Sequence, residues 1–319
     1  MARLVTLLHA WLCAMGLVVA VNPAQAAGTN MVSYVSNTGN DSANCATPAT
    51  ACKDFVTALG KTANYGEIDC VNTGNYSSAF TITQSVTIDC AGSIDFDVGG
   101  FMVNGAGIVV RLRNLSINGE AFVPWSIDAQ NMAALYIENC VISNYNAAAP
   151  HGGSAIKFEP SANSQLFVTN TIITNSGNGG GISGGIDIVP ASGVVAKVSI
   201  SHSQINGNVY GIIADGSAGG ITKGTITDSV VSGNAKDAIT VSSAGSSVVF
   251  HVDRTTVAGN LDGLVATGGG ASMLVRNSSV FNNSAGLSAT NGGTLYSYGN
   301  NSVDGNNDDG SFTGTVGLK

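Results

Sequence analysis

The sequence predicts an all-β, single-domain right-handed parallel β-helix, a solenoid of stacked coils with a short capping helix at its N-terminal end. A pattern of the form apolar-x-[Asn/His/Asp]-x-x-apolar-x-x-Asn recurs every 23 to 32 residues, a spacing typical of solenoid repeats. Each unit carries short apolar runs with the alternation of β-strands, as in SAIKFEP and DAITVSS. The units are rich in Gly and β-branched residues, which argues against helical repeats. Parallel crossovers are nearly always right-handed, so the coil should be as well.

The N-terminal segment 1–26 has the features of a Sec-type secretory signal peptide. Arg3 precedes a long apolar run, and Ala24-Gln25-Ala26 is a small-x-small cleavage site. No later segment is long and apolar enough to span a bilayer. We therefore expect an exported protein, secreted or periplasmic. The predicted parts are the signal peptide (1–26), an N-terminal strand and capping helix (27–66), the β-helix (67–310) and a C-terminal tail (311–319).

The capping helix is predicted within CKDFVTALGKTA, residues 52–63, with Phe55, Val56 and Leu59 on one side. It precedes the first strands of the β-helix, where it can cover the N-terminal end of the core. A cap is expected there because an open strand edge invites aggregation.

The cysteines of an exported chain are expected to form disulfides. Cys45 and Cys52 lie close together in a polar loop, and we predict that they pair. Cys70 and Cys90 occupy similar places in EIDC and TIDC, so a second pair is predicted with one cysteine above the other. Cys140 is then left over, and we interpret it as a buried small apolar residue.

Three ladders of equivalent side chains are expected inside the solenoid. Stacked Asn amides can hydrogen-bond from coil to coil, and Asn tolerates the left-handed backbone of a tight turn, so the Asn ladder is interpreted as structural. The first apolar ladder comprises Leu112, Ile137, Val168, Ile200, Ile226, Val252, Val275 and Tyr298. The second comprises Ile156, Ile186, Ile212, Ile239, Leu264 and Leu287, and the Asn ladder comprises Asn208, Asn234, Asn260, Asn283 and Asn306.

The net charge of the chain restricts the kinds of partner that it can bind. Without the signal peptide it holds 11 Lys and Arg against 20 Asp and Glu, a net charge of −9. An acidic protein is a poor ligand for nucleic acid. We expect a monomer with no nucleic-acid partner and no membrane span.

The N-terminal region YVSNTGNDSANC…ACKDFVTAL…GEIDCVNTGNYSSAFTITQSVTIDC resembles the start of secreted right-handed β-helix proteins of the pectin lyase-like superfamily. The resemblance extends over the whole mature chain and implies a polysaccharide or cell-surface glycan as ligand. The scaffold also hosts adhesins and other non-catalytic proteins, so it does not establish catalysis. An enzyme on this scaffold would be a polysaccharide lyase or glycoside hydrolase. The alternative is a non-catalytic cell-surface or matrix protein. The clustered Asp motifs and the R-I-K of polygalacturonases have no match.

Four outward side chains of the second strand form a candidate catalytic patch. Lys157 and Asp187 should be neighbours on adjacent coils, with Glu159 and Asp215 on the next stripe, two coils apart. Paired carboxylates suit inverting glycoside hydrolysis, and a base beside a cation suits β-elimination. The alternative interpretation is a Lys–Asp pair with two solvated carboxylates. Loops 144–154 and 175–185 are expected to wall a groove there, and His151 lies in the first of them.

Arg111, Tyr136 and Phe167 follow one another on an outward stripe beside the first ladder, and we predict a substrate-binding strip on which sugar rings can stack. Packing under a loop is the alternative. On the neighbouring stripe, Arg113 over Glu138 and Asp253 over Arg276 predict two surface ion pairs. No spacing indicates a zinc site or any required cofactor, although Ca²⁺ would suit a lyase.

Overall fold

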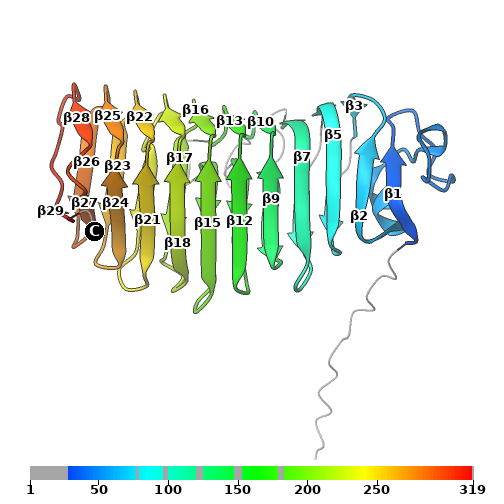
Figure 1. Cartoon of the computed structure of the whole chain (residues 1–319), viewed down its shortest axis with the longest axis horizontal. Helices are drawn as coiled ribbons and strands as arrows, with labels where there is room; N and C mark the ends of the chain where they lie inside the picture. The colour runs from blue at the N-terminus through cyan, green and yellow to red at the C-terminus, as the bar shows by residue number, and fades with distance from the viewer. Residues whose placement is uncertain are drawn as a thin grey trace, which may run out of the picture.

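The computed structural model describes residues 28–76, 79–95, 100–119, 125–146, 153–178 and 183–317. They form a rod in which successive coils stack along the long axis (Figure 1). The predicted signal peptide, residues 1–26, lies outside the described residues. No described helix is long enough and apolar enough to cross a membrane.

The repeat pattern predicted two short apolar runs in each unit, and most coils consist of three parallel strands that lie in two sheets, here called sheet A and sheet B. In these coils a long and a short strand of sheet A are separated by two turn residues, and a strand of sheet B follows after a loop. The long strands are β1 (Asn30–Val35), β2 (Thr62–Cys70), β5 (Val86–Asp95), β7 (Val109–Asn118), β9 (Ala134–Glu138), β12 (Ser164–Thr169), β15 (Val195–Ser201), β18 (Ile221–Thr227), β21 (Val248–Asp253), β24 (Ala271–Arg276) and β27 (Thr294–Ser297).

The remaining strands complete the two sheets. The short strands of sheet A are β3 (Gly74–Asn75), β10 (Val141–Ser143), β13 (Ile172–Thr174), β16 (Gln204–Asn206), β19 (Val230–Ser232), β22 (Thr256–Ala258), β25 (Ser279–Phe281), β28 (Ser302–Asp304) and β29 (Gly314–Thr315). Sheet B consists of β4 (Phe80–Ile82), β6 (Phe101–Asn104), β8 (Trp125–Asn131), β11 (Ser154–Phe158), β14 (Gly184–Ile188), β17 (Tyr210–Asp215), β20 (Ile239–Ser242), β23 (Asp262–Thr267) and β26 (Ala285–Thr290).

The turn between the long and short strands explains the third position of the repeat. The first of its two residues adopts a left-handed conformation in successive coils, a geometry that Asn and Asp tolerate better than most residues. The residues are Asn114, Asn139, Asn170, His202, Asp228, Arg254 and Asn277, with φ between 44° and 58°.

Both apolar ladders run through the interior as predicted, with one exception at the last coil. Val275 pairs with Ser297, not Tyr298, so the predicted first ladder is wrong by one residue there. Ser297 is 5% exposed, and its hydroxyl accepts hydrogen bonds from the Gly299 N–H and the Asn301 amide. These partners let a polar side chain occupy the interior position.

The Asn ladder is confirmed, and it satisfies backbone as well as side-chain groups. The Asn260 Oδ1 accepts from both the backbone N–H and the Nδ2 of Asn234, at 3.0 and 2.9 Å. Asn234 Nδ2 also donates to the Ile205 carbonyl. The left-handed residue is the one before each ladder Asn, such as Gly233 with φ 63°, and not the Asn itself.

The N-terminal end of the core is covered by the helix α1 (Phe55–Lys61), which follows a 3-10 turn, η1 (Pro48–Thr50). The Asp54 carboxylate caps α1 by accepting from the Thr57 N–H at 2.6 Å. Phe55 and Leu59 are buried, and the Phe55 ring stacks on Phe80 at 5.3 Å. Val56 is 52% exposed, so its predicted place on the buried side is wrong, because one residue along a helix turns by about 100°.

Both predicted disulfides are present, Cys45–Cys52 and Cys70–Cys90. Cys140 is 1% exposed and is the one cysteine in the described part of the chain that is not in a disulfide. Burial raises the pKa of its thiol to about 11, which keeps the thiol neutral. Cys140 is therefore a core residue, as predicted.

Candidate functional site

The predicted catalytic patch lies on the outer face of sheet B. Register places Lys157 of β11 directly between Asp128 of β8 and Asp187 of β14. The Lys157 Nζ forms an ion pair with Glu159 Oε2 at 2.8 Å. We call Asp128, Lys157, Glu159 and Asp187, with the adjoining Ser154, the sheet B cluster.

Asp187 is buried, with 6% of its surface exposed, as are Asp128 and Ser154 of the same cluster. Burial raises the pKa of Asp187 to about 7, while a hydrogen bond from the Ser154 hydroxyl and the charge of Lys157 offset part of that rise. The Oδ1 of Asp187 has no hydrogen-bond partner. Near neutral pH this carboxyl group can therefore hold or release one proton, and it lies beside an exposed Lys–Glu pair.

Asp128 was missed by the sequence-based prediction, although a signal for it exists. It follows an inward Ile in WSIDAQ, as Lys157 does in SAIKFE and Asp187 does in GGIDIV. Its Oδ2 accepts from Gln130 Nε2 at 2.8 Å, and its Oδ1 has no hydrogen-bond partner. Burial raises the pKa of Asp128, and the nearby Glu159 charge adds to the rise.

The other predicted members lie apart from the cluster. Asp215 is two coils from Glu159, about 9–10 Å along the rod. Its carboxylate accepts from the backbone N–H and hydroxyl of Ser217 at 2.8 and 2.9 Å, a local turn contact. His151 lies outside the described residues, as do parts of the loops 144–154 and 175–185. Within the described residues no three acidic, His or Cys side chains converge as a metal site would require.

The predicted binding strip lies on the outer face of sheet A, and its three members form one continuous stack. The guanidinium carbon of Arg111 lies 4.3 Å from the centroid of the Tyr136 ring. The Tyr136 and Phe167 rings are parallel within 7°, with centroids 4.6 Å apart. Tyr136 is therefore covered on both sides, whereas one face of Phe167 has no partner within the stack.

A groove of about 180 Å³ opens on that free side of Phe167. The next residue of the row is Ser199, whose small side chain cannot cover the ring. Lys197 and Lys223 are exposed neighbours on adjacent coils, and no ion pair joins either to a carboxylate of the described chain. We call this the Phe167 groove; it is lined by Gln165, Phe167, Lys197, Val198, Ser199 and Lys223.

The sequence predicted the aromatic strip but not the Phe167 groove. The repeat pattern aligns residues along a row, so Ser199 could be seen to follow Phe167. Whether the small residue leaves a cavity depends on how the neighbouring Lys side chains lie, and that was not visible in the pattern.

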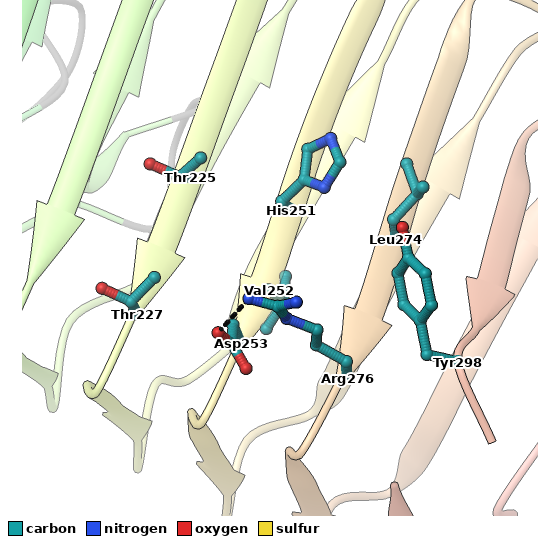
Figure 2. Close-up of a pocket in the computed structure, with 8 residues that line it drawn as sticks. All are labelled: Thr225, Thr227, His251, Val252, Asp253, Leu274, Arg276 and Tyr298. Atoms are coloured by element: carbon teal, nitrogen blue, oxygen red, sulfur yellow. Dashed lines mark hydrogen bonds and ion pairs between the residues drawn. The ribbon is translucent and has the colours of Figure 1, made fainter. Parts of the chain in front are cut away.

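A second pocket of about 320 Å³ lies further along the same face (Figure 2). It extends over β18, β21 and β24 and reaches Tyr298, just past the end of β27. We call it the His251 pocket; it is lined by Thr225, Thr227, His251, Val252, Asp253, Leu274, Arg276 and Tyr298.

One of the two predicted ion pairs on this face is confirmed. Arg276 Nη2 lies 2.9 Å from the Asp253 carboxylate. Arg113 does not pair with Glu138, as predicted, but with Glu67 and Asp89 at 3.3 and 3.0 Å. Glu138 pairs with Arg111 at 2.6 Å instead. Long side chains reach diagonally across coils, so direct rung neighbours need not be ion-pair partners.

No protein-family model and no curated protein sequence matches the chain. The coil architecture is that of a parallel β-helix, a fold also found in a solved pectate lyase. A similar solved structure is that of the pectate lyase Pel9A, with a TM-score of 0.61 and 15% sequence identity over 85% of this chain and 74% of that one. At this identity the likeness is one of fold.

Proposed function

We propose that this protein binds a polysaccharide on the outer face of sheet A, with the Phe167 groove as the main contact. The observation that carries the proposal is the face of the Phe167 ring that opens on the groove, beside two lysines that have no ion-pair partner among the described residues. A sugar ring presents an apolar face that packs on an aromatic ring, and its hydroxyls need hydrogen-bond partners. The Gln165 amide and the Ser199 hydroxyl are such partners at the edge of the groove.

The two lysines favour an acidic polysaccharide. Lys197 and Lys223 lie on an acidic protein, yet their neighbourhood on β15 and β18 holds no outward carboxylate among the described residues. Ammonium groups so placed attract anionic sugars such as uronates. Export through a signal peptide would bring the protein to such polymers, and the two disulfides fit an oxidising compartment.

The test is binding of the purified mature chain to polygalacturonate, alginate and neutral dextran. We expect affinity for one of the acidic polymers and a loss of about tenfold or more in Phe167→Ala. Tyr210→Ala is the matched control, because Tyr210 is a half-buried aromatic residue on sheet B. Equal losses in both variants, or no binding to any polymer, would refute the proposal.

Cleavage of the polymer at the sheet B cluster is a second candidate function. The raised pKa of Asp187 favours it, because a general acid must keep its proton near the working pH. In this scheme Asp187 protonates the leaving oxygen and Glu159 activates water, with Lys157 as a supporting residue. Asp215 lies two coils away and takes no part in the scheme. His151 remains a candidate substrate contact.

The assay for this second function follows reducing ends and unsaturated uronates, each with Ca²⁺ and with chelator. Reducing ends without unsaturation, lost in Asp187→Asn but retained in Asp215→Asn, would support hydrolysis at the cluster. Unsaturated product that disappears with chelator would indicate a calcium-assisted lyase. Binding without any product would leave a non-catalytic protein of the cell surface or matrix.

A further inference from the structure

The face that holds the Phe167 groove continues into the His251 pocket without interruption. Strand β18 contributes Lys223 to the groove and Thr225 to the pocket, two residues along the same strand. Phe167 and His251 lie in one outward row, joined through Ser199 and Thr225. Three coil steps separate them, which corresponds to about 14 Å along the rod.

The His251 pocket has the composition of a site for an acidic sugar. Leu274 and the Tyr298 ring supply apolar surface, and Thr225 and Thr227 supply hydroxyls (Figure 2). Arg276 is half exposed, and its Nη2 donates to Asp253 Oδ2, so that the guanidinium reaches back across the pocket. A guanidinium has five N–H donors, and those not used on Asp253 remain for a ligand.

Asp253 is the buried partner of the Arg276 guanidinium. Its side chain is 6% exposed and receives hydrogen bonds from Arg254, Arg276 and Asn277. Burial acts to raise its pKa, but the Asn277 and Arg276 hydrogen bonds outweigh burial and lower it. The carboxylate is thus an internal anchor that positions Arg276. From β12 to β24 the outward side chains include three cations, Lys197, Lys223 and Arg276, against this one buried anion.

We infer that the His251 pocket is a second subsite, and that a linear acidic polysaccharide lies along the long axis of the rod across both sites. Arg276 binds an acidic group of the sugar, and Leu274 and Tyr298 contact its ring. This inference rests on the proposed function. Two linked contacts on one polymer raise its affinity once the chain is long enough to reach both.

The experiment is calorimetric titration of the mature protein with oligogalacturonates and alginate oligomers of defined length. We expect affinity to rise by tenfold or more over the lengths that first span the groove and the pocket. Arg276→Gln should remove about tenfold of the affinity for long oligomers and little for short ones. Phe167→Ala should weaken the binding of both.

Arg254→Gln is the matched control, because Arg254 also donates to Asp253, at 2.6 Å, but does not line the pocket. A loss in Arg276→Gln that Arg254→Gln reproduces, or an affinity that does not change with length, would overturn the second subsite. If Phe167→Ala still weakened binding, the proposed function would survive that result. If no oligomer or polymer bound the wild type, both inferences would fall.

Discussion

The sheet B cluster and the Phe167 groove on sheet A carry charge in opposite ways. On sheet B, Lys157 pairs with Glu159, and Asp187 is buried with a raised pKa. On sheet A, Lys197 and Lys223 of the Phe167 groove are exposed and have no carboxylate partner among the described residues, although other charges of this sheet, such as Arg111 with Glu138, are paired. The sheet B cluster satisfies its charges internally or neutralises them by protonation, whereas the two lysines of the groove remain unpaired. The stability of the protein should therefore respond to changes on sheet B and its affinity to changes on sheet A.

The largest expected effect is on stability and comes from Asp187→Asn. The folded-state pKa of Asp187 is raised from 3.8 to about 7, so folding favours the protonated form. The stabilising contribution of that form is complete below pH 4 and is lost as the pH rises from about 4 to 7. The loss amounts to at most about 4 kcal/mol.

The Asp187→Asn variant should not show this loss. Its free energy of unfolding should exceed that of the wild type at pH 8 but not at pH 4. Denaturant unfolding at the two pH values measures the difference. Asp69, whose pKa burial and Glu67 raise to about 6, contributes to both proteins and cancels in the comparison. If the free energy of unfolding depended on pH in the same way in variant and wild type, ionisation of Asp187 would not destabilise the folded protein.

An intermediate effect is expected from Lys197→Met combined with Lys223→Met. Affinity for the acidic polymer should fall about two- to fivefold per lysine at low salt, and the difference should shrink in high salt because ions screen exposed charges. Stability should not change, since neither lysine has an ion-pair partner among the described residues. Lys53→Met, at an exposed lysine outside both faces, is the control. Losses that persist in high salt would contradict an electrostatic role.

The smallest effect on stability is expected from Lys157→Met. Its pair with Glu159 is partly exposed, with side-chain accessibilities of 42% and 29%, and contributes less than about 1 kcal/mol. Removing the Lys157 charge should nevertheless raise the pKa of Asp187, since that charge lowers it. Carboxyl chemical shifts followed by NMR during a pH titration measure this change. Lys197→Met should leave the pKa of Asp187 as it is; an equal shift would mean that the effect is not local.

Most of the fold could be predicted because its signals are local and repeated. The spacing of apolar residues placed the coils, and the equivalent positions of Cys70 and Cys90 predicted their disulfide. The errors occur where the repeat ends. Val56 lies in the cap, where the period is helical, and Tyr298 lies in the last coil, where the interior accepts a serine with two hydrogen-bond partners.

The candidate sites could be predicted in part. The rows of outward residues follow from register. The sequence could therefore predict the stack of Arg111, Tyr136 and Phe167 and the contact of Asp253 with Arg276. Arg113 pairs with Glu67 and Asp89 because its long side chain can reach several carboxylates, and register alone does not say which of them it contacts. The burial of Asp187 was also not foreseen, because strand alternation assigns a side chain to the outer face without saying what covers it.

The sequence by itself determined the solenoid, its inward ladders and the rows of residues on each face, since strand alternation and coil period are properties of neighbours along the chain. The tertiary structure decided which outward charges are paired, which carboxyl groups are buried and where the surface is hollow. Those outcomes depend on the directions of long side chains and on contacts between coils. A repeat pattern carries no information about either.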